Sequence, residues 1–139
     1  MRYLLDSDVI IDFLKDKGPG ASLLPELIDQ NNLYISVVSW MEIAYGIKKI
    51  SKTTPESRQF DLLLRDLSIE ILAVDVKTAD RFIDLKLTLE KQGNPLSDFD
   101  LLIASATISN NLTLVTRNRE HFKRIKNLKL YDITSSSVT

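Results

Sequence analysis

Short apolar runs alternate with longer stretches of helical periodicity along the chain. The runs at residues 2–5, 33–36, 69–72 and 112–116 are rich in aliphatic and aromatic side chains, as buried strands are. Between them, apolar residues recur three and four positions apart, as one face of a helix requires. Strands separated by helices favour a parallel sheet that is covered on both faces. We therefore predict an α/β fold of three layers, α/β/α, with a mostly parallel central sheet.

Capping residues predict where several helices begin. Asp8 or Ser7 is expected to cap the first helix and Ser39 the third. Thr54 and Asp75 are expected to cap two later helices, because each precedes a strongly helical pattern.

The last third of the chain carries a helix that is apolar on almost every side. This helix should start near Ser97, and its segment 101–108 should lie in the middle of the domain. Asn118 is expected to cap a short basic helix, and residues 128–131 are expected to form an edge strand.

Four acids stand where a predicted strand gives way to a helix or where a helix begins. They are Asp6, Glu42, Asp98 and Asp100. The carboxyl ends of parallel strands and the adjoining helix starts gather on one edge of an α/β sheet, so these acids should meet there. Carboxylates that lie close together repel one another unless a cation neutralises them. The pattern therefore favours a divalent metal site.

Each acid also has a structural explanation. One of Asp6 and Asp8 could cap the first helix, which leaves the other at the strand end. Ser39 and Glu42 have the spacing of a capping box, in which the glutamate bonds back to the cap's amide. Asp98 lies in the first turn of its helix, where the helix dipole favours an acid. These explanations account for each acid separately but not for their common edge.

The composition restricts a metal site to oxygen ligands. The chain has no cysteine and one histidine, which excludes thiolate sites and histidine-rich sites. That residue, His121, is expected to have a surface or packing role because it lies in a basic helix. With 139 residues, the chain fits one domain. Because it lacks a spanning apolar stretch and a signal peptide, we expect a cytoplasmic protein without a membrane partner.

The charge is unevenly distributed. The net charge is −1, which argues against coating of nucleic acid through charge alone. Between residues 117 and 129, however, a single acid accompanies six basic residues, namely Arg117, Arg119, Lys123, Arg124, Lys126 and Lys129. This basic segment is either a solvated helix face or a contact surface for an anionic substrate.

Four segments together resemble the PIN-domain family, and within it the VapC-type toxins of toxin–antitoxin pairs. The segments are LLDSD at 4–8, ISVVSWMEIAYG at 35–46, DFDLLIA at 98–104 and LTLVTRN at 112–118. The likeness covers nearly the whole chain. It implies a PIN domain over residues 1–134, followed by a flexible tail at 135–139.

The resemblance implies roles for the residues of the acidic edge. Asp6, Glu42 and Asp100 match the principal acids of the family, which hold one or two Mg²⁺ or Mn²⁺ ions, and Asp98 is an additional catalytic carboxylate nearby. The supporting positions are Ser7, Asp8, Thr116 and Asn118. Asp8 stands where many relatives have asparagine, and Asn118 stands where many have a fourth aspartate.

The implied activity is that of a metal-dependent endoribonuclease toxin. Carboxylates hold hard cations, which activate a water molecule and offset charge on the phosphate. The substrate is expected to be a structured RNA, either tRNA or rRNA, whose backbone is held by Arg117, Arg119, Lys123 and Arg124. The resemblance further implies a homodimer and a small antitoxin that blocks the acidic pocket.

Two other functions are consistent with parts of the sequence. Asp6 and Asp8 after a strand are similar to the opening Asp-x-Asp of haloacid-dehalogenase-type phosphohydrolases, although no clear catalytic lysine follows. Asn118 in place of an acid is consistent with a non-catalytic PIN-type module that binds RNA or protein.

Overall fold

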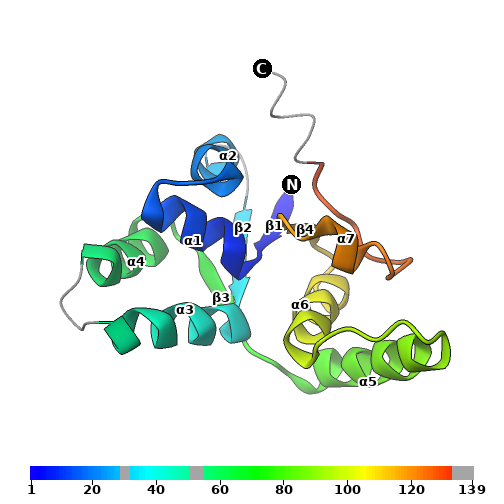
Figure 1. Ribbon diagram of the computed structural model, residues 1–139. Coiled ribbons are helices and arrows are strands. Elements are labelled where there is room, and N and C mark those ends of the chain that lie inside the picture. The colour runs from blue at the N-terminus through cyan, green and yellow to red at the C-terminus, as the bar shows by residue number, and fades with distance from the viewer. Residues whose placement is uncertain (29–31, 51–54, 133–139) are drawn as a thin grey trace.

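Four parallel strands form the centre of the molecule (Figure 1). The computed structural model describes residues 1–28, 32–50 and 55–132. In the sheet, the order is β3-β2-β1-β4, with β1 pairing in parallel to both neighbours. The strands are β1 (Arg2–Leu5), β2 (Asn32–Ser36), β3 (Glu70–Leu72) and β4 (Thr113–Val115). The predicted α/β class with a parallel sheet is confirmed.

Helices cover both faces of the sheet, as the alternation of elements predicts (Figure 1). They are α1 (Ser7–Lys15), α2 (Pro19–Ile28), α3 (Val37–Ile50), α4 (Pro55–Asp66), α5 (Val76–Lys91), α6 (Asp98–Ser109) and α7 (Arg119–Phe122). In the described part of the chain, no helix has both the length and the apolar character that crossing a membrane requires.

The core is divided into two clusters by the sheet. Tyr3 and Leu5 of β1 pack into one cluster with α1, α2 and α4, whereas Leu4 between them packs into the other with α6. This is the alternation of side chains that a strand buried on both faces requires. The segment 101–108 of α6 is largely buried, as its all-round apolar pattern predicts. Because α6 is fixed in this way, Asp100 in its first turn has a fixed position.

The starts of α1 and α3 both bear on the candidate site. Of the residues considered as caps of α1, Asp6 is the N-cap and Asp8 and Ser7 are not, because the Asp6 side chain accepts a hydrogen bond from the Ser7 amide. The third helix begins directly after β2 at Val37 rather than near Ser39. Ser36 Oγ accepts the Val38 amide at 3.1 Å, so Ser36 satisfies a free amide at this helix start.

The C-terminal part of the sheet is shorter than predicted. Residues 128–131 form no strand but a single parallel bridge between Leu114 and Leu130. The Leu114 amide donates to the Lys129 carbonyl and the Tyr131 amide to the Leu114 carbonyl, both at 2.8 Å.

Two of the predicted helix caps are confirmed: Asp75 caps α5, and Ser97 caps α6. Thr54 and the predicted tail at 135–139 lie outside the described residues.

Gly20 is required by the close packing of α2 on α1. A Cβ at this position would lie 2.6 Å from the Val9 carbonyl oxygen and 2.8 Å from Asp12 Cβ. We expect Gly20→Ala to lower the free energy of unfolding by roughly 1–3 kcal/mol, because backbone must move. Gly46→Ala on α3 meets nothing within 4 Å and should instead stabilise by about 0.5–1 kcal/mol. Urea unfolding of the two variants measures the difference, and equal effects would contradict this account.

Candidate metal and catalytic site

Asp6, Asp8, Glu42 and Asp100 lie at the carboxyl ends of the strands or at the adjoining helices, and this region is called the acidic edge. Asp6 and Thr116 form its centre. Asp6 directly follows β1 and is buried, and Thr116 follows the neighbouring strand β4. Thr116 Oγ1 donates to Asp6 Oδ2 at 2.8 Å, while the Ser7 amide donates to Asp6 Oδ1 at 2.8 Å. The parallel pairing of β1 and β4 brings these residues together across 110 positions of sequence. Both carboxylate oxygens of Asp6 are therefore held in fixed directions.

Asp8, in the first turn of α1, lies beside Asp6, because the same Thr116 hydroxyl contacts both carboxylates. Thr116 Oγ1 is 3.3 Å from Asp8 Oδ2, and the Arg117 amide donates to the same oxygen at 3.2 Å. The Asn118 amide in turn donates to Thr116 Oγ1 at 3.0 Å. The segment after β4 thus holds both aspartates through one hydroxyl and one backbone amide.

Both aspartates have pKa values above the ordinary range. Burial raises the pKa of Asp6 to about 7, and the nearby charges of Asp8 and Asp100 act in the same direction. The hydrogen bonds from Thr116 and Ser7 oppose this shift in the pKa but do not cancel it. Burial also raises the pKa of Asp8, against the hydrogen bond from the Arg117 amide. A cation at this edge would offset the repulsion between Asp6 and its acidic neighbours Asp8 and Asp100.

Glu42 reaches the edge from α3 and is held by Ser7. Ser7 Oγ donates to Glu42 Oε1 at 2.9 Å, across 35 positions of sequence. The capping box expected for Ser39 and Glu42 does not form, since α3 starts two residues before Ser39 and Ser39 is buried within the helix. Glu42 therefore does not cap α3. Its carboxylate lies next to the first turn of α1 instead.

Asp98 and Asp100 have different surroundings although only one residue separates them. Asp100 Oδ2 lies 3.4 Å from Nδ1 of His121. Asp98 Oδ1 instead pairs with Lys86 Nζ of α5 at 3.0 Å, and the Asp98 side chain is 63% exposed. Residues two apart on a helix point in roughly opposite directions, so the two acids cannot share one site. The structure groups Asp100, but not Asp98, with the residues of the acidic edge.

One residue at the edge, His121, was not predicted to belong to it. His121, for which a surface or packing role was expected, contacts Asp100 and also lies 2.7 Å from Asn118 Nδ2 through the same Nδ1. Asn118 stands at the start of α7 but makes no capping bond with its side chain. The sequence signal for this placement of His121 was its position on a single helical turn directly after β4.

The buried Asp12 accepts a hydrogen bond from the Gly20 amide at 3.0 Å and pairs with Arg117 Nε at 3.1 Å.

The four cations expected to hold RNA all have partners within the chain. Arg117 is tied to the buried Asp12, which gives it a structural role. Arg119 pairs with Asp132 at 3.3 Å and Lys123 with Glu120 at 2.8 Å. Arg124 donates to the Pro95 carbonyl at 2.8 Å. The Lys123 pair in particular is exposed on both sides, and such pairs contribute little, so exchange of their carboxylates for phosphates costs little.

The donor set at this edge fits a hard divalent cation. Carboxylate oxygens from Asp6, Asp8, Glu42 and Asp100 are the ligands that Mg²⁺ and Mn²⁺ favour. Within residues 1–28, 32–50 and 55–132, no three acidic or imidazole side chains are close enough to hold one ion together. The site is therefore a set of pairs around one edge, Asp6 with Asp8 and Asp100 with His121, rather than a closed cage.

Comparison with known proteins agrees with the fold. A family model for the PIN domain matches residues 3–128. The chain is 35% identical to Ribonuclease VapC2 of Rickettsia felis, over 94% of this chain and 96% of that protein. It is 30% identical to the tRNA(fMet)-specific endonuclease VapC of Shigella flexneri, over 95% of this chain and 98% of that protein.

Solved structures show the same architecture. A structure of VapBC2 from Rickettsia felis bound to a promoter DNA fragment superposes with a TM-score of 0.83 at 32% identity, covering 94% of this chain and 98% of that chain. A structure of VapBC-1 from nontypeable Haemophilus influenzae superposes with a TM-score of 0.81 at 28% identity, covering 96% and 99%.

Proposed function

The chain belongs to the PIN-domain family and is an endoribonuclease of the VapC type, and from this premise we propose that it cuts structured RNA at its acidic edge with the help of Mg²⁺ or Mn²⁺. The observation that carries the metal requirement is the pairing of Asp6 and Asp8: burial raises both pKa values, and the charge of Asp8 raises that of Asp6 further. Acids kept this close without a cation would destabilise the fold at neutral pH.

Each residue of the edge has a separate task in this proposal. Asp6, Glu42 and Asp100 are the acids that hold the cation. Thr116 and the Ser7 amide fix the direction of the Asp6 carboxylate, and the Ser7 hydroxyl fixes that of Glu42. When bound, the cation supplies positive charge that makes a water molecule more acidic and offsets the charge developing on the phosphate.

The proposed substrate is a folded RNA, with tRNA as the first candidate. One of the relatives is named as an endonuclease specific for tRNA(fMet). Arg119, Lys123 and Arg124 lie on or near α7, next to the edge that Asn118 and His121 reach. The surface ion pairs of Arg119 and Lys123 exchange readily for phosphates, which makes RNA binding sensitive to salt. The proposed place of action is the cytoplasm, where this substrate is present.

Cleavage of total cellular RNA by the purified, antitoxin-free chain tests the proposal. We expect a few discrete cuts in the presence of Mn²⁺, with the new 5′ ends mapping to one tRNA or one rRNA position. Uniform degradation would contradict the specificity for structured RNA. Absence of cleavage by the folded chain would contradict the nuclease activity itself.

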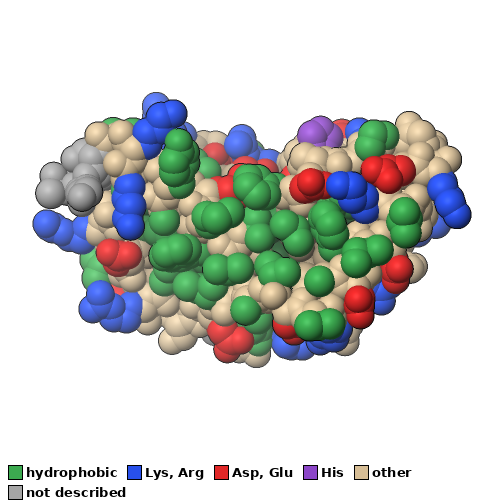
Figure 2. Space-filling view, turned by 90° about the horizontal axis from the view of Figure 1, so that it is seen from below, with side chains coloured by type: hydrophobic (Ala, Val, Ile, Leu, Met, Phe, Trp, Pro, Cys, Tyr) green, Lys and Arg blue, Asp and Glu red, His purple; other side chains and the backbone are tan. Residues whose placement is uncertain are grey.

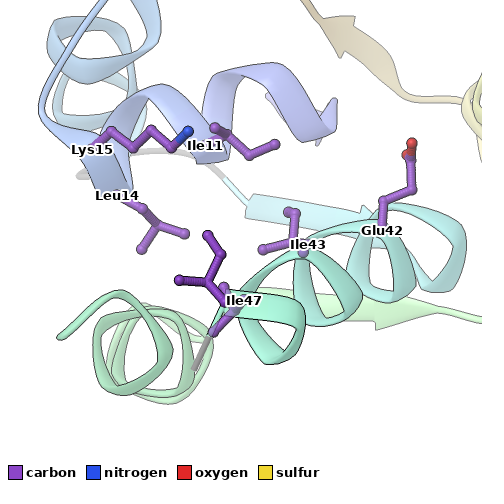
Figure 3. Close-up of a pocket in the computed structure, with 8 residues that line it drawn as sticks. Ile11, Leu14, Lys15, Glu42, Ile43 and Ile47 are labelled. Carbon is purple, nitrogen blue, oxygen red and sulfur yellow. The ribbon is translucent and has the colours of Figure 1, made fainter. Parts of the chain in front are cut away.

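An apolar groove next to Glu42 supports an antitoxin as partner. The groove has a volume of about 190 Å³ and is formed by α1 and α3. Ile11 and Leu14 of α1 point toward Ile43 and Ile47 of α3, and Glu42 lies at one end (Figure 3). Solved relatives are complexes of a toxin with its antitoxin. We propose that an apolar antitoxin segment fills this groove and places a basic side chain at Glu42.

Filling the groove should weaken inhibition by the antitoxin. Gly46 lines the groove, and a Cβ at this position meets nothing within 4 Å. Gly46→Trp should therefore fold normally but raise the antitoxin dissociation constant at least about tenfold, which corresponds to one buried anchor. Gly46→Ala is the control. Unchanged inhibition of Gly46→Trp, measured by antitoxin titration of RNA cleavage, would contradict this docking site.

Exposed apolar side chains on another face support a homodimer. Hydrophobic side chains gather across the face that Figure 2 shows, which is the lower side of Figure 1 and includes α3 and α5. Trp40, Ile71, Val74 and Val76 are 37%, 42%, 41% and 77% exposed. Apolar patches of this kind on soluble domains mark interaction surfaces. We propose that two copies of the chain meet through this face.

A charge at the start of α5 should separate the two copies. Val76→Glu places an acid in the first helical turn, which the helix dipole favours, so the monomer should stay folded. The dimer dissociation constant should rise at least about tenfold, because a buried acid without a partner is costly. Sedimentation measures the change. Thr88→Glu is the control, because Thr88 lies on the same helix but lines a pocket with Arg81 and Arg124. Equal dimerisation of both variants would contradict the proposed interface.

A further inference from the structure

His121 is the one histidine of the chain, and it lies against an acid of the proposed metal site. Its Nδ1 atom is 3.4 Å from Asp100 Oδ2 and 2.7 Å from Asn118 Nδ2. α7, which carries His121, is a single turn that follows β4, so the ring reaches the same sheet edge as Thr116. The roles assigned above to the acids leave this ring without a task.

The contact between His121 and Asp100 is not a hydrogen bond. Nδ1 has one in-plane direction for a proton or a lone pair, and the Asn118 amide takes it at 2.7 Å. This holds in either orientation of the amide. The Asp100 oxygen at 3.4 Å lies beyond the usual N–H···O range. The imidazole nitrogen and the carboxylate oxygen are therefore neighbours that no proton joins.

Their separation suits two ligands of one cation. Adjacent ligands of an octahedral ion with bonds of about 2.1 Å stand about 3 Å apart. The distance of 3.4 Å between Nδ1 and Oδ2 is only slightly longer. Rotation of the Asn118 amide about its terminal torsion, which is a soft torsion, releases the Nδ1 lone pair. A neutral imidazole then adds a donor without adding to the negative charge of the edge.

We propose that His121 is a direct ligand of the divalent cation, on the Asp100 side of the site, and that it favours Mn²⁺ over Mg²⁺. This inference rests on the metal dependence proposed above and adds a nitrogen donor to it. Mn²⁺, like Mg²⁺, takes oxygen ligands, but as a first-row transition ion it also accepts imidazole, which Mg²⁺ binds poorly. Asp100 supplies the oxygen ligand beside the imidazole, and water molecules complete the shell, as is usual for Mg²⁺ bound by one or two protein ligands.

Spectroscopy of bound Mn²⁺ tests this proposal without any measurement of activity. Untagged full-length chain is titrated with Mn²⁺ in the absence of RNA, and electron spin echo spectra detect nitrogen nuclei bonded to the ion. Because the chain has one histidine, an imidazole coupling identifies His121 without further assignment. His121→Gln keeps a polar side chain and removes the imidazole. Asn118→Ala removes the amide that competes for Nδ1.

We expect nitrogen coupling in the wild-type chain and in Asn118→Ala, and none in His121→Gln. The Mn²⁺ dissociation constant of His121→Gln should rise at least about tenfold. Its Mg²⁺ dissociation constant should change by about threefold at most, because Mg²⁺ gains little from nitrogen. Bound Mn²⁺ without nitrogen coupling in the wild-type chain overturns the role of His121 and leaves the carboxylate site intact. No binding of Mn²⁺ at all overturns both proposals.

Discussion

Asp100→Asn is expected to reduce RNA cleavage by about a thousandfold, because loss of a metal-binding carboxylate removes several kcal/mol of charge stabilisation. Asparagine has nearly the shape of aspartate, so α6 should remain in place with its cap at Ser97. Single-turnover cleavage of the identified RNA at saturating Mn²⁺ measures the effect. The circular dichroism spectrum should be that of the wild-type chain.

Asp98→Asn is the matched control for Asp100→Asn. It makes the same chemical change two residues earlier on the same helix, but it removes an exposed ion pair with Lys86. Exposed pairs contribute little to stability, and Asp98 lies outside the site, so cleavage should change by no more than about threefold. Equal losses in the two variants would contradict the grouping of Asp100, rather than Asp98, with the residues of the site.

The metal-free chain is expected to lose stability as the pH rises from about 4 to about 7. Asp6 has a pKa near 3.8 when unfolded, and burial raises it to about 7 in the fold. Between these two values the folded state binds more protons than the unfolded state, so each step upward in pH favours unfolding. The full effect is on the order of 4 kcal/mol, and the raised pKa of Asp8 acts in the same direction.

Asp6→Asn isolates this contribution. The variant lacks the ionisable group, so in metal-free buffer it should be more stable than the wild-type chain at pH 8 and similar at pH 4. Mn²⁺ should stabilise the wild-type chain strongly at pH 8 and weakly at pH 5, where protons compete for the carboxylates. Urea unfolding in chelator and in Mn²⁺ at each pH measures both effects. An Asp6→Asn variant with the same pH dependence as the wild-type chain would contradict the assignment.

The fold and the common edge of the acids could be predicted from the sequence. Alternation of short apolar runs with helical patterns is sufficient for a parallel α/β sheet, and that topology alone brings Asp6 and Thr116 together. The family resemblance added the roles of Glu42 and Asp100. The family membership also removes the phosphohydrolase as an explanation for Asp6 and Asp8.

The directions of individual side chains could not be predicted. The spacing of Ser39 and Glu42 is that of a capping box. No box forms, because α3 begins directly after β2 and Ser36 Oγ accepts the Val38 amide at the helix start. Asp98 and Asp100 have equivalent sequence surroundings, and only the rotation of α6, fixed by its buried residues, separates them. Arg117 belongs to the basic segment, yet a buried acid on α1 binds it. Such choices depend on tertiary contacts that local sequence does not encode.

Removal and return of the metal tests the central claim most directly. The purified, antitoxin-free chain is incubated with RNA after exhaustive chelation, and Mn²⁺ or Mg²⁺ is then added back in increments. The account predicts no cleavage in chelator, full recovery with either ion, and no recovery for Asp100→Asn. Cleavage that persists in chelator at the wild-type rate would contradict a metal-dependent nuclease at the edge formed by Asp6, Glu42 and Asp100.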